Sequence, residues 1–245
     1  MSRYEVEKRK WDEFAGRLRG VYGRKREGFT VTETYEGVFG RLNTLRPVVG
    51  HLDLGAGPKT VLDIGCGAGW TTKLLAQKAR VVVGVDVSFE SVRLAAAIAR
   101  HNRLDNVHVL VADGDRLPFR DGAFDCVFGH AILHHLELDE ALGQVSRLLK
   151  PGGRAAFAEP LSQNRLARAA RVLKQRALSR HPGTDRPLTY RDRATFEKHF
   201  RRVAVVETGF VGGRIRALGP WESRLLARFP FLRSTATQAC FLLEK

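Results

Sequence analysis

The chain has 245 residues, 44% of them hydrophobic and 27% charged, which is the composition of a folded protein with a sizeable core and argues against a disordered chain. No apolar run approaches the ~18 residues of a membrane span, no secretory signal opens the chain, and three scattered cysteines exclude a disulfide scaffold, so we expect a cytoplasmic protein. The net charge of +15 is uneven, because residues 31–160 are nearly neutral whereas residues 161–202 alone carry +9.

The order of apolar runs predicts an α/β fold. Residues 1–46 are expected to be mostly helical. Short runs rich in Val, Ile and Phe then predict five strands, at 61–64, 81–85, 107–111, 124–128 and 154–158. Helices are expected between them and beyond them, at 70–79, 88–102, 137–149, 161–180, 190–200 and 220–229, with two more strands near 203–207 and 238–243. This alternation favours a doubly wound parallel sheet with helices on both faces and ligands at the carboxyl ends of the strands.

A glycine-rich loop is the most informative motif. The run Gly65-Cys66-Gly67-Ala68-Gly69 follows a predicted strand and precedes a predicted helix. Asp86 ends the next strand about 20 residues on, where a carboxylate accepts hydrogen bonds from ribose hydroxyls. The dinucleotide pattern would need glycine in place of Trp70, so we expect a nucleoside without a pyrophosphate.

Five segments resemble, in order, the motifs of the class I S-adenosylmethionine-dependent methyltransferases of the small-molecule type. They are 62–69, Asp86, 112–119, 124–128 and 148–153. The resemblance covers about residues 55–160 and implies a Rossmann-like, seven-stranded, mostly parallel sheet with an antiparallel last strand. It also implies S-adenosyl-L-methionine as cofactor.

The resemblance assigns several residues to the cofactor. It implies that Asp86 binds the ribose, Asp113 the adenine amino group and Asp63 the methionine amino group, while Val87 packs against the adenine. Further cofactor-binding residues implied are Gly65, Cys66, Gly67, Gly69, Gly114, Gly129 and His130. Two alternatives stay open, because Asp63 also suits a loop-orienting role and Asp113 also suits a turn.

A histidine-rich run follows the fourth predicted strand, beside the expected methyl donor. His134 and His135 are the leading candidates for a general base, with His130 third, because histidine exchanges protons near neutral pH. The alternative is that one of the pair caps a helix or makes a core hydrogen bond. Glu159, at the end of the fifth strand, is expected to orient a histidine or bind a substrate cation, or else to pair with an arginine. No metal site is expected, because adjacent histidines point apart and no Cys/His ligand set accompanies them.

The expected domain organisation has two parts. Residues 1–46 form an N-terminal helical lid, and residues 47–245 form the methyltransferase domain, with 161–189 as a basic lid insertion. The basic segment suits an acidic substrate, an anionic membrane surface, RNA phosphates or plain solvent exposure.

The favoured function is methyl transfer to oxygen or carbon of a small or lipid-like acceptor, such as a quinone, phenol, lipid or secondary metabolite. The run after the fourth strand lacks the Asn/Asp-Pro-Pro-Tyr pattern typical of amino-directed methyltransferases, which argues against nucleic-acid amines. The alternative is an RNA-directed methyltransferase or RNA-binding factor that uses residues 161–202. A third hypothesis is a cofactor-binding partner protein without turnover of its own.

Overall fold

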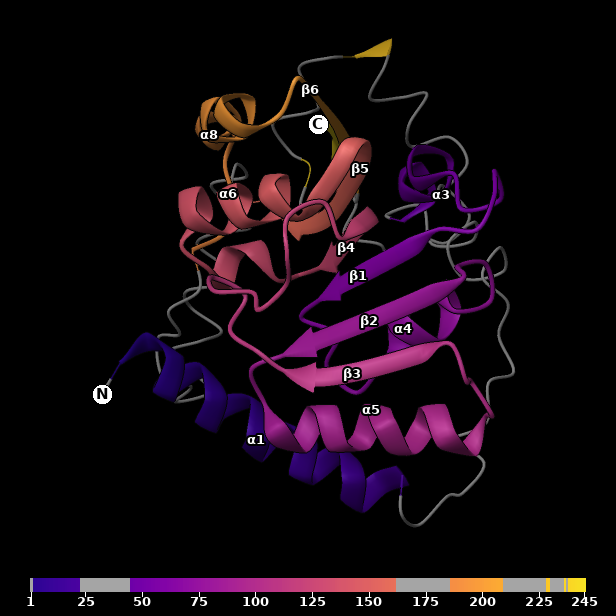
Figure 1. The fold of residues 1–245 in the computed structure, drawn as a ribbon. Coiled ribbons are helices and arrows are strands. Elements are labelled where there is room, and N and C mark those ends of the chain that lie inside the picture. Colours follow the sequence, from indigo (N-terminus) through magenta and orange to yellow (C-terminus); the bar gives the residue numbers. More distant parts are fainter. Residues whose placement is uncertain (1, 23–44, 162–185, 209–227, 230–235, 237) are drawn as a thin grey trace.

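This computed structural model describes the chain except for residues 1, 23–44, 162–185, 209–227, 230–235 and 237. Its centre is a seven-stranded sheet with the order β3-β2-β1-β4-β5-β7-β6 (Figure 1). The strands are β1 (Thr60–Ile64), β2 (Val81–Asp86), β3 (Val107–Val111), β4 (Phe124–His130), β5 (Leu149–Pro160), β6 (Arg202–Thr208) and β7 (Gln238–Glu244). Strands β1 to β5 are parallel, and β7 runs antiparallel to both β5 and β6. The predicted fold class is confirmed.

Helices cover both faces of the sheet. They are α1 (Arg3–Tyr22), α3 (Arg46–Leu52), α4 (Trp70–Leu75), α5 (Phe89–His101), α6 (Leu138–Leu148) and α8 (Arg193–His199), with the short 3-10 helices η2 (Leu133–His135) and η3 (Tyr190–Asp192). One hydrophobic cluster lies between the sheet and α6 and α8, and another lies between the sheet and α3 and α4. Among the helices of the described ranges, none is long and apolar enough to cross a membrane.

The central strands are buried on both sides. Along β1, Val61 belongs to the cluster under α3 and α4, whereas Leu62 belongs to the cluster under α6. Along β4, Phe128 likewise belongs to the cluster under α3 and α4, and Val127 belongs to the cluster under α6. Successive side chains point to opposite faces, so strands covered on both faces need apolar residues at every position. Burying one side chain such as Phe128 stabilises the fold by about 1.5–3 kcal/mol, and the packed sheet fixes the positions of its carboxyl edge.

The fifth strand begins earlier than the apolar pattern indicates. Strand β5 starts at Leu149, which pairs with Phe124, and the next pair along β4 joins Arg154 to Cys126. Residues 150–153, between the predicted helix and the predicted strand, are therefore a bulge inside the strand. These residues are polar or glycine, so the apolar pattern does not indicate a strand there.

Other predicted boundaries need smaller corrections or lie outside the described residues. The helix predicted over 70–79 ends at Leu75 and continues as a turn. The helix predicted over 161–180 and most of the basic insertion at 161–189 fall outside the described residues, as does the helix predicted over 220–229 apart from its last two positions.

Of the predicted N-terminal lid, residues 1–46, the structure describes helix α1, whereas residues 23–44 lie outside the described residues. Helix α1 lies along α5 at the edge of the molecule (Figure 1). Helix α3 instead contributes Val48 and Leu52 to the core under the sheet. Division of the chain at residues 46 and 47 stays a prediction.

Candidate active site

A cavity of about 810 Å³ lies at the carboxyl ends of β1, β2 and β4 and is bordered by α1. This edge of an open α/β sheet is where ligands bind, and the volume suits small molecules. Seven of the predicted cofactor-binding residues line the cavity: Gly65, Gly67, Asp86, Val87, Asp113, Gly114 and His130. Of the other four, Asp63, Cys66 and Gly129 are next in sequence to lining residues, whereas Gly69 lines a separate small pocket against α5.

The glycine loop is tied to the neighbouring strand by its backbone. The N–H groups of Gly65 and Cys66 both donate to the carbonyl oxygen of Val85, at 2.8 and 2.9 Å. Gly65 has φ +70°, and a Cβ there would lie 2.7 Å from the side chain of Ile132. A side chain at Gly65 would therefore strain the backbone and collide with the wall of the cavity. Burial keeps the pKa of the Cys66 thiol well above its usual range, so this thiol stays protonated.

Asp86 closes the loop from the end of β2. Its Oδ2 accepts from the N–H of Gly67 and its Oδ1 accepts from the N–H of Ser88, both at 2.9 Å. Burial raises the pKa of Asp86, and the Asp12 carboxylate adds to the shift, whereas the two backbone donors oppose it. Since each carboxylate oxygen can accept a second hydrogen bond, Asp86 retains the capacity to hold two hydroxyl groups.

Asp63 is fully buried beneath the loop. Its Oδ2 accepts from the hydroxyls of Thr71 and Thr72 at 2.8 and 2.7 Å, while its Oδ1 has no hydrogen-bond partner among the described residues. Burial raises the pKa of this carboxyl from 3.8 to about 7. A buried acceptor without a donor is costly, so the arrangement favours a ligand that brings a cation or a donor.

The position of Asp113 fits both roles that the sequence left open. Its side chain accepts from the N–H of Asp115 at 3.0 Å, which closes a turn, and the residue also lines the cavity. A Cβ at Gly114 would lie 2.9 Å from the end of the Leu136 side chain, so a larger residue there would require Leu136 to move.

The three predicted catalytic residues separate into two groups. Glu159 is buried, and its Oε1 accepts from the N–H groups of Ile132 and Leu133, both at 2.8 Å. Its Oε2 lies 2.7 Å from Nδ1 of His134. Neither Glu159 nor His134 lines the cavity, whereas His135 does. His134 and Glu159 thus hold the loop, and His135 faces the ligand space.

His130 lines the cavity at the end of β4, next to the exposed ring of Trp70. Burial lowers the pKa of His130, which keeps its imidazole neutral at physiological pH. A neutral imidazole there is suited to hydrogen bonding with a ligand.

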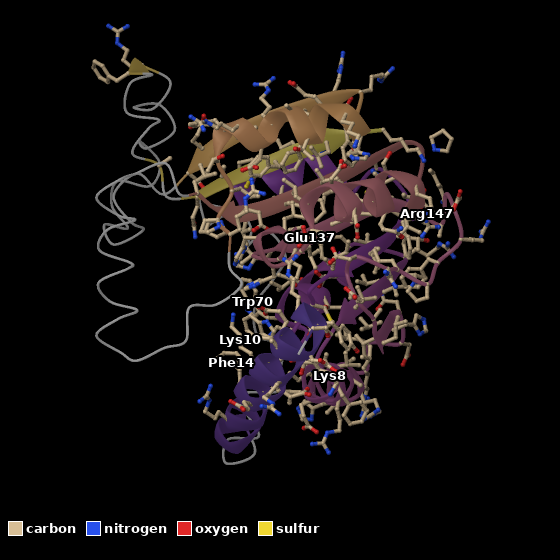
Figure 2. The ribbon with its side chains drawn as sticks, turned by 90° about the vertical axis from the view of Figure 1, so that its left-hand side faces the viewer. Lys8, Lys10, Phe14, Trp70, Glu137 and Arg147 are labelled. Carbon is tan, nitrogen blue, oxygen red and sulfur yellow. The ribbon has the colours of Figure 1, made fainter. Side chains whose placement is uncertain are left out.

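Four cavity-lining side chains on α1 are not among the predicted site residues. They are Arg3, Tyr4, Glu7 and Trp11, and they lie in the segment that the sequence predicts only as a lid. The available signal was Glu7, an acidic residue one helical turn before Trp11 on the face that packs against the domain. In Figure 2, Lys8 lies on one side of α1, and Lys10 and Phe14 lie on the other.

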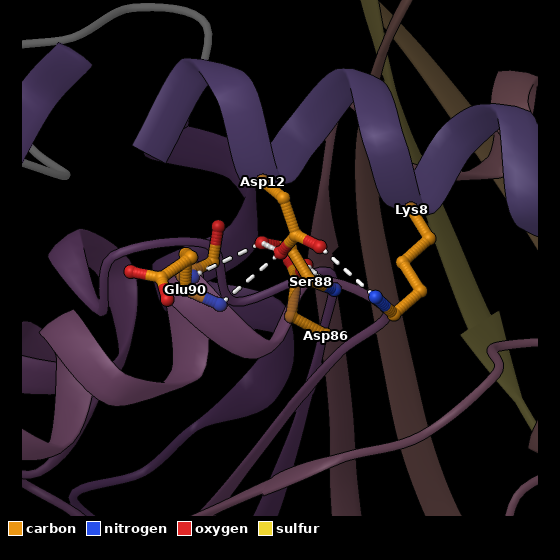
Figure 3. Close-up of polar contacts among 6 residues, drawn as sticks. Lys8, Asp12, Asp86, Ser88 and Glu90 are labelled. Carbon is orange, nitrogen blue, oxygen red and sulfur yellow. Dashed lines mark hydrogen bonds and ion pairs between the residues drawn. The ribbon is translucent and has the colours of Figure 1, made fainter. Parts of the chain in front are cut away.

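Helix α1 is fastened beside Asp86. Oδ1 of Asp12 accepts from the hydroxyl of Ser88 at 2.6 Å and from the N–H of Glu90 at 3.1 Å, while Lys8 pairs with Oδ2 (Figure 3). Burial raises the pKa of Asp12, but these donors outweigh it, so the pKa lies below its usual value. Ser88 also caps α5, by accepting from the N–H of Ser91. One serine therefore joins α1 to the side of the cavity where Asp86 lies.

Comparison with known proteins agrees with this geometry. A family model described as "Methyltransferase domain" matches residues 62–157. Methyltransferase GfsG of Streptomyces halstedii is 37% identical over 112 residues, which cover 44% of this chain and 40% of GfsG. Demethylmenaquinone methyltransferase of Thermus thermophilus is 35% identical over 132 residues, which cover 52% of this chain and 60% of that protein. Residues 62–157 therefore carry a methyltransferase domain similar to those of the class I S-adenosylmethionine-dependent methyltransferases. The chain spans less than two thirds of the length of these two relatives.

A solved structure extends the likeness of this methyltransferase to the whole chain. Geranyl diphosphate C-methyltransferase from Streptomyces coelicolor, in complex with Mg²⁺, geranyl diphosphate and S-adenosyl-L-homocysteine, superposes with a TM-score of 0.67. The match covers 100% of this chain and 98% of that one, at 17% identity. At this identity the match shows a shared fold.

The residues of the methyltransferase fit the family's cofactor. Asp86 has acceptor capacity for two ribose hydroxyls, and the orphaned Oδ1 of Asp63 suits the amino-acid cation. Gly65 and Gly67 line the cavity without side chains, so the loop backbone is open to a ligand there.

Proposed function

We propose that this protein transfers the methyl group of S-adenosyl-L-methionine to an oxygen or carbon atom of a small or lipid-like acceptor. The observation that carries the proposal is that one cavity is lined by both the ribose-binding carboxylate Asp86 and the histidine His135. When bound, the cofactor supplies an electrophilic methyl group on a sulfonium. The protein has to orient the acceptor, exclude water and take up a proton where the acceptor carries one.

Asp86, Asp113 and Asp63 hold the cofactor in this proposal. Asp86 accepts from the ribose hydroxyls, and Asp113 accepts from the adenine amino group. Asp63 faces the amino group of the methionine moiety through the oxygen that has no donor within the described part of the chain. Val87, which follows Asp86 in the cavity wall, packs against the adenine.

Replacing Asp63 with asparagine is expected to have distinct effects on the free energy of unfolding and on cofactor affinity. Because the folded-state pKa of about 7 exceeds the ordinary 3.8, the folded protein keeps a proton that the unfolded chain loses. The stability from this group is complete below about pH 4 and is lost as the pH rises through 7. Urea unfolding at several pH values should show wild type losing stability relative to Asp63→Asn over that range. S-adenosylhomocysteine should bind the variant about tenfold more weakly, as a lost hydrogen bond to a charge predicts; equal affinity would contradict the role of Asp63.

His135 is the general base in this proposal. A histidine base uses both of its ring nitrogens. One bonds to a group that orients the ring, and the other accepts the transferred proton. His134 is committed to Glu159 and lies behind the cavity wall, whereas His135 lies in the wall. His130 is the third candidate.

The relatives support a small acceptor. The aligned proteins include demethylmenaquinone methyltransferases and the O-methyltransferase cnsE of Penicillium expansum. A cavity of about 810 Å³ provides room for a cofactor and a compact acceptor together.

The proposal is tested by transfer of radiolabelled methyl groups to a panel of quinones, phenols, prenylated lipids and, as the alternative substrate, RNA. We expect a product from the small-molecule panel, with turnover lowered about 10²- to 10⁴-fold in His135→Gln. The control is His108→Gln, at an exposed histidine on β3 outside the cavity. Methylation of RNA alone would overturn the proposed acceptor class, and full turnover by His135→Gln would overturn the base.

A further inference from the structure

A carboxylate of the lid helix is buried against the cavity-facing histidine. Glu7 is only 6% exposed, although it lies on α1, near the N-terminus of the chain. Its Oε2 accepts from the indole N–H of Trp11 at 2.9 Å and lies 3.5 Å from Nδ1 of His135. Acidic side chains are rarely buried unless they are paired, so this placement needs a reason.

The surroundings of His135 leave Glu7 as its nearest anionic neighbour. The ring of Trp11 meets the His135 ring edge-on with centroids 5.7 Å apart, and the His134 ring lies 4.0 Å away. His134 directs its own Nδ1 to Glu159. Nζ of Lys10, also on α1, lies 3.7 Å from the same oxygen of Glu7, Oε2. Asp86, across the cavity, is a second acidic group that acts on His135.

We propose that Glu7 is a positioning residue of the methyl-transfer reaction, which holds His135 in the orientation and tautomer that accept a proton from the acceptor. The inference rests on the proposed function, because it takes His135 as the base. A carboxylate facing Nδ1 retains the proton on that nitrogen and directs the lone pair of Nε2 to the acceptor. Catalytic hydrogen bonds are often long before substrate binds, and the 3.5 Å separation is of this kind.

The proposed step balances without any further reactant. The acceptor atom forms a bond to the methyl carbon as the bond from that carbon to sulfur breaks. The acceptor proton moves to Nε2 of His135, and Glu7 stays ionised and stabilises the imidazolium that forms. The base therefore comes from the domain and its orienting carboxylate comes from α1, so the pair is complete only while α1 is docked.

The test measures the histidine itself and then turnover. In protein labelled at histidine and saturated with S-adenosylhomocysteine, imidazole resonances are titrated by NMR, with His135→Gln used for assignment. Glu7→Gln keeps the shape and an acceptor for Trp11 but removes the charge, so we expect the pKa of His135 to fall. Trp11→Phe removes the donor that fixes Glu7 and should shift the same resonance less. The matched control is Glu13→Gln, at an exposed glutamate on the same helix.

Turnover with the acceptor found in the panel completes the test. We expect kcat of Glu7→Gln to fall about tenfold or more with little change in KM, and the acid limb of the pH–rate profile to follow the shifted imidazole. An unchanged His135 titration in both Glu7→Gln and Trp11→Phe would overturn the proposal even where His135→Gln is inactive. Full turnover by His135→Gln would instead show that the proposed base is wrong.

Discussion

Replacement of Asp86 by alanine is expected to abolish measurable binding of S-adenosylhomocysteine. In the proposed complex Asp86 accepts from both ribose hydroxyls, and the N–H groups of Gly67 and Ser88 hold its carboxylate in position. Hydrogen bonds to a charged group are worth about 1.5–3 kcal/mol each, so the loss of two predicts a decrease in affinity of about 10²- to 10⁴-fold. Calorimetric titration of wild type and variant, with NAD as a ligand control, measures the effect.

Asp105→Ala is the matched control for this substitution, because Asp105 is exposed and lies outside the cavity. We expect its affinity for S-adenosylhomocysteine to equal that of wild type. Asp86→Asn keeps the shape of the side chain and one acceptor oxygen. Its affinity for S-adenosylhomocysteine should therefore lie between those of Asp86→Ala and Asp105→Ala. If Asp86→Ala binds as tightly as Asp105→Ala, the ribose does not lie at the end of β2.

Replacement of Glu159 by alanine is expected to destabilise the protein by about 3–5 kcal/mol, the range found when one partner of a buried charged pair is removed. Three donors converge on this buried carboxylate: the N–H groups of Ile132 and Leu133 and the ring of His134. The substitution leaves these donors without an acceptor in a dry environment. Stabilities of whole domains are about 5–15 kcal/mol, so the effect should be evident in urea unfolding.

Glu197→Ala serves as the control, because this glutamate forms an exposed pair with Arg193 on α8 and contributes little. Glu159→Gln should be intermediate, since its carbonyl oxygen still accepts from the two backbone donors. Unfolding of Glu159→Ala at the same urea concentration as Glu197→Ala would show that the loop after β4 is held by other contacts.

The sheet was predictable because its signals are local. Val-rich runs define β1 to β3, and glycines at positive φ mark the turn from β1 into α4. The start of β5 was not predictable, because the bulge at 150–153 contains no apolar pattern and exists only through pairing with β4. The hydrophobic pattern of a sequence identifies buried strands. It does not identify strand segments that form mainly because they pair with a neighbouring strand.

The candidate site likewise has one part that the sequence predicts and one part that it does not. The cofactor half follows from one strand–loop–helix unit and the acid on the next strand, which are short-range patterns. The different positions of His134 and His135 depend on Glu159, 25 residues away from His134, and on Glu7 at the other end of the chain. Neighbouring identical residues carry no local signal of which one faces the cavity.

We expect one cavity beneath α1 to hold the cofactor with its reactive sulfur toward His135. A crystal structure of the protein with S-adenosylhomocysteine would show where the ligand lies. The ribose should lie at Asp86, the adenine beside Asp113 and the sulfur open to the space lined by His135, with α1 in place. A ligand whose sulfur faces away from His135, or one bound elsewhere on the protein, would rule this arrangement out.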